Sequence, residues 1–363
     1  MAVSFRSIAA VLAVATLAAA CASDESASSD TGGPTDTGGP TDTGGPSDTS
    51  GPSTGEITVY SGRSQELVEP ILDQFTELTG ITVGFRGGDS GELAAQLLTE
   101  GDASPADVFF SQDAGALGAV ADAGLFTTLP ADLVSSVPAE FRSTEDLWVG
   151  TSGRVRVFLV NPDLAPEPPT TIDDLLDPAW KGKIGFAPNN ASWQSFVTGL
   201  RVLRGEDAAR TWLEGFAAQD PVPFENNVAV RDAVDSGELA IGLVNHYYLY
   251  EKIAAEGADA VTAVNQFVAA GDPGGLVNVA GVGVLASSKH LDDALELVGF
   301  LLSETGQRYF ADETFEYPVV TGVAASDLLP AFDSLEPPAI DLSDLDSIAE
   351  TQELLSDVGL LTL

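Results

Sequence analysis

Residues 239–250 read LAIGLVNHYYLY, an apolar run that passes directly into a cluster of aromatic side chains. The apolar half predicts a buried strand, and the aromatic half lies where that strand ends. Three of the six tyrosines of the chain, Tyr247, Tyr248 and Tyr250, stand here beside His246. Phenolate is a hard anionic donor, and a highly charged metal ion lowers the phenol pKa enough to deprotonate it. The pair Tyr247 and Tyr248 therefore predicts metal ligands, or else amphipathic rings that cover the start of a helix.

Strands and helices alternate before this stretch. Apolar runs predict strands at 57–60, 81–85 and 107–110, and the helical spacing of apolar residues predicts helices at 67–78, 90–98 and 113–123. This repeated order of strand and helix indicates the α/β class, with a mostly parallel sheet covered by helices.

A second α/β unit follows the first. Two extended segments are expected at 146–150 and 154–160, joined by a turn at 151–153, with further strands at 183–187 and 279–285. Helices are expected at 171–176, 190–203, 208–218, 227–235, 292–302 and 305–310. Two lobes with more than one crossing between them place a cleft at the carboxyl ends of strands, where open sheets bind ligands.

The charge of the chain is strongly acidic. It has 363 residues with 15 Lys+Arg against 55 Asp+Glu, a formal net charge of −40. Such a field argues against nucleic acid or an anionic membrane surface as a partner. It favours cationic ligands, although a high net charge is also an ordinary means of staying soluble.

The N-terminus has the pattern of an export signal. Residues 1–20 carry one positive charge, Arg6, then an apolar stretch that ends in LAAA before Cys21, the only cysteine. This arrangement resembles a bacterial lipoprotein processing site, although Ala18 stands where such sites more often have Leu. It implies a lipid on Cys21 and attachment to the outer face of the cytoplasmic membrane. Residues 21–55 are rich in Gly, Pro, Thr, Ser and Asp, with a repeated TGGPTD, and we expect a disordered tether.

Polar side chains follow the predicted strands. They are Arg63 and Ser64 after the first strand, Gln112 after the third, and Asn190, Ala191 and Ser192 before a helix whose free N–H groups could hold an anion. Asn227 begins the helix before the tyrosine strand, and helix capping alone would explain both Asn227 and Ser192. An arginine in a chain with few cations is expected to be paired or to bind an anion, which makes Arg63 a candidate.

Signals for catalysis are few. The sequence lacks a G-x-S-x-G elbow, zinc-ligand spacing, a P-loop and a dinucleotide fingerprint. His246 could serve as a general base, but the more ordinary interpretation is a residue at a helix start that hydrogen-bonds locally. The sequence therefore favours a binding protein over an enzyme.

Several segments together resemble the bacterial ferric-iron-binding proteins, the solute receptors of ABC importers. They include ITVYSGRSQELVEPILDQF, WVGTSGRVRVFLVNP, PAWKGKIGFAPNNASWQSFV and NNVAVRDAVDSGELAIGLVNHYYLYEK, and the resemblance covers about residues 56–363 in order. It implies a bilobed periplasmic-binding-protein fold of type II that closes over Fe(III) and passes it to an ABC permease. The implied lobes are 56–154 with 278–330 and 155–277 with 331–363, in a monomer that binds no nucleic acid.

The resemblance also assigns roles to residues. It makes Tyr247 and Tyr248 iron ligands, and it implies a synergistic carbonate or phosphate. The anion site falls on Arg63, Ser64, Asn190, Ala191, Ser192, Asn227 and Asn245, with Gln112 and Arg154 as weaker or indirect contacts.

This chain departs from the family pattern at three positions. Ser64 stands where some members have a histidine, Gln112 where some have a glutamate, and Trp193 where others have a third tyrosine. The two tyrosines and the anion would then supply most of the iron ligands. One alternative is a receptor for an organic cation of the polyamine or thiamine type, in which the tyrosines form an aromatic wall. A more remote alternative is a secreted hydrolase that uses His246.

Overall fold

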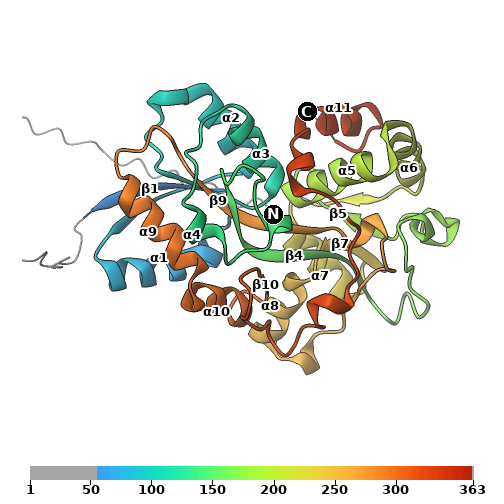
Figure 1. Ribbon diagram of the computed structural model, residues 1–363. Coiled ribbons are helices and arrows are strands. Elements are labelled where there is room, and N and C mark those ends of the chain that lie inside the picture. The colour runs from blue at the N-terminus through green and yellow to red at the C-terminus, as the bar shows by residue number, and fades with distance from the viewer. Residues whose placement is uncertain (1–54, 362–363) are drawn as a thin grey trace, which may run out of the picture. The chain divides into compact units, whose positions relative to one another are not determined.

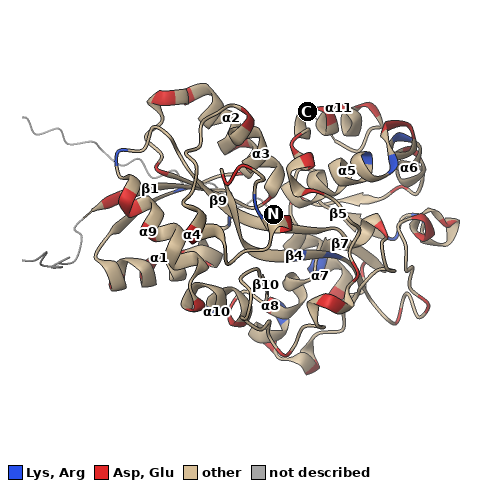
Figure 2. Cartoon of the chain, viewed as in Figure 1, with Lys and Arg blue, Asp and Glu red and all other residues tan. Residues whose placement is uncertain are grey.

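The computed structural model describes residues 55–361 (Figure 1). The predicted signal peptide, Cys21 and the tether up to residue 54 lie outside the described residues. Within the described part, no helix is both long and apolar enough to span a bilayer. Acidic residues are spread over the helices around both sheets, while lysine and arginine are sparse (Figure 2).

The first sheet carries the predicted parallel strands. Its strand order is β2 (Thr82–Gly87), β1 (Glu56–Ser61), β3 (Val108–Ser111), β9 (Val277–Val284) and β4 (Val149–Val160). Strand β1 pairs in parallel with β2 and β3, whereas β9 runs antiparallel between β3 and β4. The helices of this half are α1 (Gln65–Thr79), α2 (Ser90–Glu100), α3 (Ala114–Asp122), α4 (Ala131–Val134), α9 (Leu291–Leu302) and α10 (Glu304–Asp312).

Helix α1 shows how the sequence sets these boundaries. Val68, Ile71, Leu72 and Phe75 recur at helical spacing and are buried in the first core. The helix ends at Gly80, which adopts φ 80° and donates its N–H to the Thr76 carbonyl. Glycine reaches this left-handed conformation at little cost, so the chain can turn at once into β2.

Strand β4 corrects one prediction. Instead of two extended segments and a turn at 151–153, residues Val149–Val160 form one fully buried strand of 12 residues. The register shifts between Gly150 and Ser152, and the Thr151 hydroxyl donates to the Ala280 carbonyl, so the Thr-Ser-Gly sequence forms a bulge rather than a turn. The strand pairs with β9 as far as Val155 and with β7 from Arg156 onward.

The second sheet shares strand β4 with the first. Its order from there is β7 (Ile241–Asn245), β5 (Ile184–Phe186) and β6 (Val222–Pro223), and β8 (Val264–Gln266) also pairs with β4 in this sheet. Strand β10 (Tyr317–Pro318) pairs with the part of β4 that belongs to the first sheet. Its helices are α5 (Ala191–Arg204), α6 (Glu206–Ala218), α7 (Asn227–Asp235) and α8 (Tyr247–Glu256). Aromatic rings fill the core between β5, α5 and α6, and the rings of Trp212 and Phe216 stack with centroids 5.2 Å apart.

The C-terminal segment touches both cores. The 3-10 turn Leu342–Leu345 contributes Leu342 and Leu345 to the first core, and α11 (Ile348–Asp357) contributes Leu354 and Leu355 to the second. Further 3-10 turns lie at Gly101–Ala103, Ala139–Phe141, Asp173–Leu176, Pro178–Trp180, Ala258–Ala260, Pro273–Gly275 and Phe332–Ser334. Helix α11 was not predicted, whereas the α/β alternation of the preceding chain is confirmed.

Candidate metal centre

A cleft of about 930 Å³ lies where loops from the two sheets face each other. On one side it is lined by residues that follow β1, β2 and β3, including Arg63, Ser64, Glu66, Asp89 and Gln112. On the other side it is lined by residues around the starts of α5, α7 and α8, including Asn190, Asn226, Asn227, Tyr247, Tyr248 and Glu251. The predicted cleft at strand ends is therefore present, and it contains both tyrosines of the pair.

The tyrosine pair sits at the junction of β7 and α8. Strand β7 ends at Asn245, and Tyr247 is the first residue of α8. The rings of Tyr247 and Tyr248 stack, with centroids 4.2 Å apart and planes at 29°. Tyr247 is only 3% exposed, whereas Tyr248 is half-buried and its hydroxyl lies 3.5 Å from Nδ2 of Asn227. Two phenol groups thus enter the cleft from one short turn.

Burial keeps the Tyr247 phenol neutral in the metal-free protein. Burial is the main reason that the pKa of Tyr247 lies well above its ordinary value, and the neighbouring Tyr248 raises it further. The positive charges of Arg63 and Arg154 act in the opposite direction and stabilise the phenolate. Since a bare phenolate is costly here, ionisation of Tyr247 requires a strongly charged cation at the same place.

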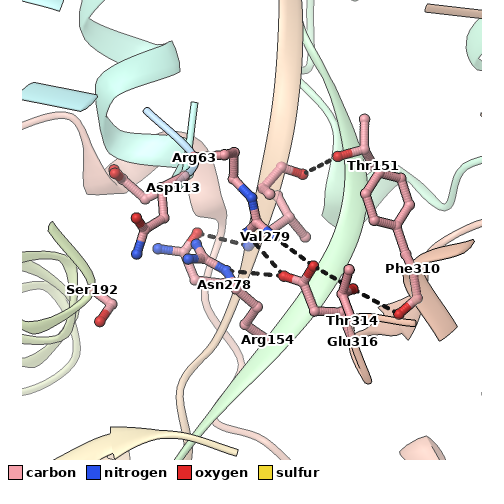
Figure 3. A network of polar contacts seen from close by, with 12 residues as sticks. Arg63, Asp113, Thr151, Arg154, Ser192, Asn278, Val279, Phe310, Thr314 and Glu316 are labelled. Carbon is pink, nitrogen blue, oxygen red and sulfur yellow. Dashed lines mark hydrogen bonds and ion pairs between the residues drawn. The ribbon is translucent and has the colours of Figure 1, made fainter. Parts of the chain in front are cut away.

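Arg63 is held by a carboxylate that sequence reasoning did not identify. Its Nη1 and Nη2 donate to Oε1 and Oε2 of Glu316 at 3.0 and 2.7 Å (Figure 3). Burial alone would lower the pKa of Arg63, but Glu316 raises it above its ordinary value. The structure therefore pairs Arg63, while its Nε has no hydrogen-bond partner among the described residues.

Arg154 on β4 lies beside this pair and is even less satisfied. Its Nε is 3.9 Å from Oε1 of Glu316, and both Nε and Nη2 lack hydrogen-bond partners within the described residues. With its amide oxygen toward Arg154, Gln112 accepts from Nη1 at 3.2 Å and donates to the Gly62 carbonyl at 3.2 Å. Burial, and then the nearby Arg63, lower the pKa of Arg154. Buried donors without acceptors are costly, so these nitrogens suit an added anion.

The start of α5 lies at one corner of the cleft, which Asn190 lines while Ala191 and Ser192 are buried behind it. Asn190 is the N-cap, and its Oδ1 accepts from the Ser192 amide at 3.0 Å and from the Ser192 hydroxyl at 2.6 Å. Nδ2 of Asn227 donates to the same oxygen at 3.1 Å. Arg156 donates to the Ser192 carbonyl at 3.1 Å, which fixes the first turn from below. Ala191 is the first residue of α5 and is also buried.

Two capping predictions need correction. Ser192 does not cap α5, because Asn190 does. Asn227 does not cap α7 either, because the side chain of Asn226 accepts from the Ala229 amide at 2.9 Å. With the capping position filled by its neighbour, Asn227 turns inward and reaches Asn190 and Tyr248. Ser64 precedes α1, makes no capping bond with its side chain, and is exposed at the cleft.

Asn245 and Trp193 take different positions. Asn245, the last residue of β7, is 2% exposed, and its Nδ2 has no partner within the described part of the chain. Trp193 is buried in the second core, with its ring against Phe186 and Phe216, and does not line the cleft. A tryptophan at this position therefore supplies packing rather than a donor atom.

His246 does not hydrogen-bond locally, so that prediction is wrong. Its Nδ1 accepts from the Val155 amide at 3.2 Å, and its Nε2 lies 2.9 Å from the Phe315 carbonyl. The first bond requires a free lone pair on Nδ1, so the neutral ring carries its proton on Nε2 and donates it to Phe315. Burial lowers the pKa of His246 to about 4. A fully buried imidazole with both nitrogens engaged is unsuited to act as a general base.

Carboxylates in the cleft were also missed by sequence reasoning. Glu66, Asp89 and Glu251 line it, and Glu251 follows Tyr247 by one helical turn on the same face of α8. Burial raises the pKa of Glu251 to about 7, with Glu316 as the next cause. Among the described residues no three His, Cys, Asp or Glu side chains gather to hold a metal ion.

A cleft between two sheets that share a long strand is the arrangement of a periplasmic binding protein. Comparison with solved structures supports this class. The chain is similar to iron-bound HitA from Pseudomonas aeruginosa, with 35% identity, a TM-score of 0.81, and coverage of 84% of this chain and 100% of that one. It is also similar to the Trichodesmium protein IdiA (FutA) in complex with iron and citrate, with 30% identity, a TM-score of 0.72 and coverage of 85% and 100%. The predicted fold class is confirmed.

The sequence comparisons define the family. Residues 103–339 match the family described as bacterial extracellular solute-binding protein, and the chain belongs to it. The chain is 34% identical to the Fe(3+)-binding periplasmic protein of Serratia marcescens over 308 residues, which is 84% of this chain and 90% of that protein. It is 33% identical to the major ferric iron-binding protein of Neisseria meningitidis serogroup B, with coverage of 84% and 93%. The family binds solutes and is not enzymatic, which excludes the hydrolase alternative based on His246.

Proposed function

We propose that this protein captures Fe(III) in the cleft together with a carbonate or phosphate ion, and delivers the iron to an ABC import permease. Tyr247 and Tyr248 are the protein ligands, each bound as the phenolate. Lipid attached to Cys21 anchors the protein to the outer face of the cytoplasmic membrane, and residues 22–55 tether the folded part to it. The relatives named as ferric-iron-binding proteins support the choice of iron.

One observation carries this proposal: two stacked phenols lie in the same cleft as Arg63, whose Nε has no partner among the described residues, and Arg154 is buried beside Arg63 with two further such nitrogens. Phenols supply hard oxygen donors for Fe(III), and the arginine nitrogens supply donors for an anion. Because the phenols bind iron and the arginines hold an anion next to it, a site with few carboxylates could still fill the coordination sphere of iron. Ser64, Gln112 and Trp193 stand at the three positions where this chain departs from the family pattern. The anion would fill the coordination positions of iron that these residues leave open.

The anion site extends around the start of α5. Asn190, Ala191 and Ser192 present the first turn of a 14-residue helix, whose N-terminus favours negative charge. Asn227 closes one side of this corner, and Nδ2 of Asn245, which has no partner among the described residues, is a further donor. Arg63 would contribute through Nε and through its charge, since Glu316 occupies its other nitrogens. Ser64, Gln112 and Arg154 complete the opposite side.

Iron capture would involve closure of two lobes. We assign residues 56–154 and 278–330 to one lobe, and 155–277 and 331–363 to the other, although Leu342 and Leu345 of the last segment pack into the core of the first. The tyrosines belong to the second lobe, while Arg63 and Gln112 belong to the first. A ligand that contacts both lobes favours the closed form, because part of its binding free energy is available only there.

The organic-cation alternative has one observation in its favour, since Glu66, Asp89 and Glu251 line the cleft. A single experiment separates the two functions. Fe(III), supplied as its nitrilotriacetate complex, is titrated into the iron-free protein with bicarbonate present, and spermidine is titrated in parallel by calorimetry. We expect a visible phenolate-to-iron charge-transfer band that saturates at one iron per protein, and no heat from spermidine. A colourless protein that binds spermidine would refute the proposal.

A further inference from the structure

We propose that Arg156, which does not line the cleft, is a positioning residue for the occupied site: it fixes the start of α5, and its buried positive charge is balanced only by the negative charge that binding brings to the cleft. This inference rests on the proposed function. It gives a role to a third buried arginine, which acts on the tyrosines and the anion through other residues.

The contacts of Arg156 tie α5 to β7. The residue lies on β4 opposite Asn245, the last residue of β7, and is 5% exposed. Its Nη1 donates to the Ser192 carbonyl at 3.1 Å and to the Ser192 hydroxyl at 3.3 Å, while its Nη2 donates to the Leu243 carbonyl at 3.0 Å. One guanidinium group therefore holds the first turn of α5 against the strand that leads to the tyrosines.

The partners of Arg156 are all neutral. Among the described residues it forms no ion pair, and its Cζ lies 5.8 Å from the ring centroid of Trp193 and 5.3 Å from that of Phe196. Burial lowers the pKa of Arg156 to about 9, an effect that a phenolate at Tyr248 opposes and the charge of Arg154 reinforces. Arg156 therefore stays positively charged at neutral pH, although burial makes that charge costly.

The carboxylates buried near the cleft serve the other two arginines. Glu316 binds Arg63, and the charges of Glu316 and Asp113 both act on Arg154 (Figure 3). These four side chains balance one another, two positive against two negative, and leave no carboxylate for Arg156. Within the described part of the chain, the carboxylates that line the cleft form no ion pair with it either; they are Glu66, Asp89 and Glu251.

Hydrogen bonds connect Arg156 to the phenol of Tyr248. The Ser192 hydroxyl accepts from Arg156 and, at 3.4 Å, from Nδ2 of Asn227, which itself lies 3.5 Å from the Tyr248 hydroxyl. A phenolate at Tyr248, or an anion at the start of α5, places negative charge at this network. The charge of Arg156 lies behind the N-terminus of α5 and adds to the positive end of the helix dipole. Binding therefore supplies the negative charge that the described residues do not offer to Arg156.

A residue of this kind favours binding at the expense of the stability of the unoccupied protein. Replacing a buried charge by an apolar side chain of similar size is often neutral or stabilising, because the cost of desolvating the charge disappears. An arginine with a purely structural role shows the opposite pattern, since its loss weakens the fold and leaves ligand binding intact. The two measurements together therefore identify the role of Arg156.

Arg156→Met and Arg156→Lys in the full chain test this inference. Titration with ferric nitrilotriacetate in bicarbonate should show an iron affinity reduced at least about tenfold in Arg156→Met. Its charge-transfer band should move to longer wavelength, because the phenolate loses a nearby positive charge. Arg156→Lys keeps the charge but not both contacts, so its band should stay at the wild-type position and its affinity should be intermediate. Urea denaturation of iron-free Arg156→Met should give a free energy of unfolding equal to or above that of wild type.

Arg201→Met is the matched control, because Arg201 is a buried arginine of α5 that pairs with Glu206 and donates to the Thr351 hydroxyl. It should lower the free energy of unfolding and leave the iron affinity and the band unchanged. Arg156→Gln, which keeps an amide donor without the charge, replaces Arg156→Met if that variant does not fold, and should show the same loss of affinity.

Two results would overturn the inference: an iron affinity of the folded uncharged variant within about threefold of wild type, or an unshifted band. Iron-free Arg156→Met that is much less stable than wild type would also overturn it, since that result shows a structural anchor. The unfolding measurements need no iron, so a wild-type protein that stays colourless with iron would refute the proposed function separately.

Discussion

Nδ1 of His246 accepts a hydrogen bond from the backbone amide of Val155 at 3.2 Å, and this bond joins the turn that carries the tyrosines to the strand shared by both sheets. Its other nitrogen binds the Phe315 carbonyl, one residue before Glu316. The residue that most resembled a catalytic base is therefore a structural link between three segments: β4, the start of α8, and the chain around residue 315.

We expect His246→Ala to lower the free energy of unfolding by about 3 kcal/mol, because it leaves a buried amide and a buried carbonyl unpaired and opens a cavity. Urea denaturation of the iron-free protein measures this loss. His290→Ala changes an exposed histidine at the start of α9 and serves as the control, with no expected change. A His246→Ala protein as stable as wild type would contradict the linking role.

Replacement of the tyrosines should remove the iron complex stepwise. Tyr247→Phe or Tyr248→Phe alone should weaken iron binding by about a hundredfold or more and reduce the visible band, and the double variant should be colourless. Titration with ferric nitrilotriacetate, followed by absorbance, provides the measurement. Tyr250→Phe is the matched control, since Tyr250 lies on the same helix but packs against Phe315 outside the cleft. Loss of colour in Tyr250→Phe would show that the wrong phenols have been assigned.

Two adjacent asparagines separate helix capping from anion binding. Asn226→Ala removes the cap of α7 and should cost about 1 kcal/mol of unfolding free energy while leaving iron binding intact. Asn227→Ala removes the contacts to Asn190 and Tyr248 and should raise the bicarbonate concentration needed for half-maximal colour by about tenfold. Equal effects of the two changes on iron binding would contradict this division of roles.

Iron binding should strengthen as pH rises. Burial, then Tyr248, hold the pKa of Tyr247 well above its ordinary value, so the iron-free protein keeps this proton throughout the neutral range, whereas the iron complex has lost it. Each proton released on binding makes the apparent affinity rise about tenfold per pH unit between about pH 5 and 8. Competition against a chelator of known protonation constants measures the slope. A slope of zero would mean that Tyr247 does not bind as the phenolate.

Glu251 should make the folded protein less stable as pH rises. Burial, then Glu316, raise its pKa from 4.5 to about 7, so the folded state binds this proton more tightly than the unfolded state does. The associated stabilisation is complete below pH 4.5 and is lost as pH rises through about 7. The free energy of unfolding of Glu251→Gln should therefore be higher than that of wild type at pH 8 and close to it at pH 4.5. Urea denaturation at the two pH values checks this, and a difference that does not depend on pH would contradict it.

Local patterns in the sequence predicted most of the fold. The apolar spacing of α1, the glycine that ends it and the apolar run of β7 act within a few residues, so they could be recognised without the structure. Helix α11 was missed because its buried residues, Leu354 and Leu355, are few and it depends on packing against the second core. The Thr-Ser-Gly sequence in β4 predicts a turn, and only its pairing with the partner strand shows that it forms a bulge.

The candidate site was predictable only in part. The tandem tyrosines and the polar loops stood out, since they are unusual side chains at strand ends. Glu316 could not be found in this way, because Arg63 lies 253 positions away and one acid among 55 carries no distinguishing signal. The choice between Asn226 and Asn227 as the cap depended on a single step along the chain, which sequence patterns do not resolve.

The position of β9 also constrains the order in which the protein can be assembled during synthesis. Strand β9 is inserted between β3 and β4, yet it is made after β7, β5 and every other strand of the second sheet. As the chain leaves the ribosome, the first sheet therefore stays incomplete between β3 and β4 until residues 277–284 emerge. Neither half of the molecule can be produced as a separate folded piece by a simple cut, and a nascent chain that stops short of β9 would expose the unpaired edges of β3 and β4 to its neighbours.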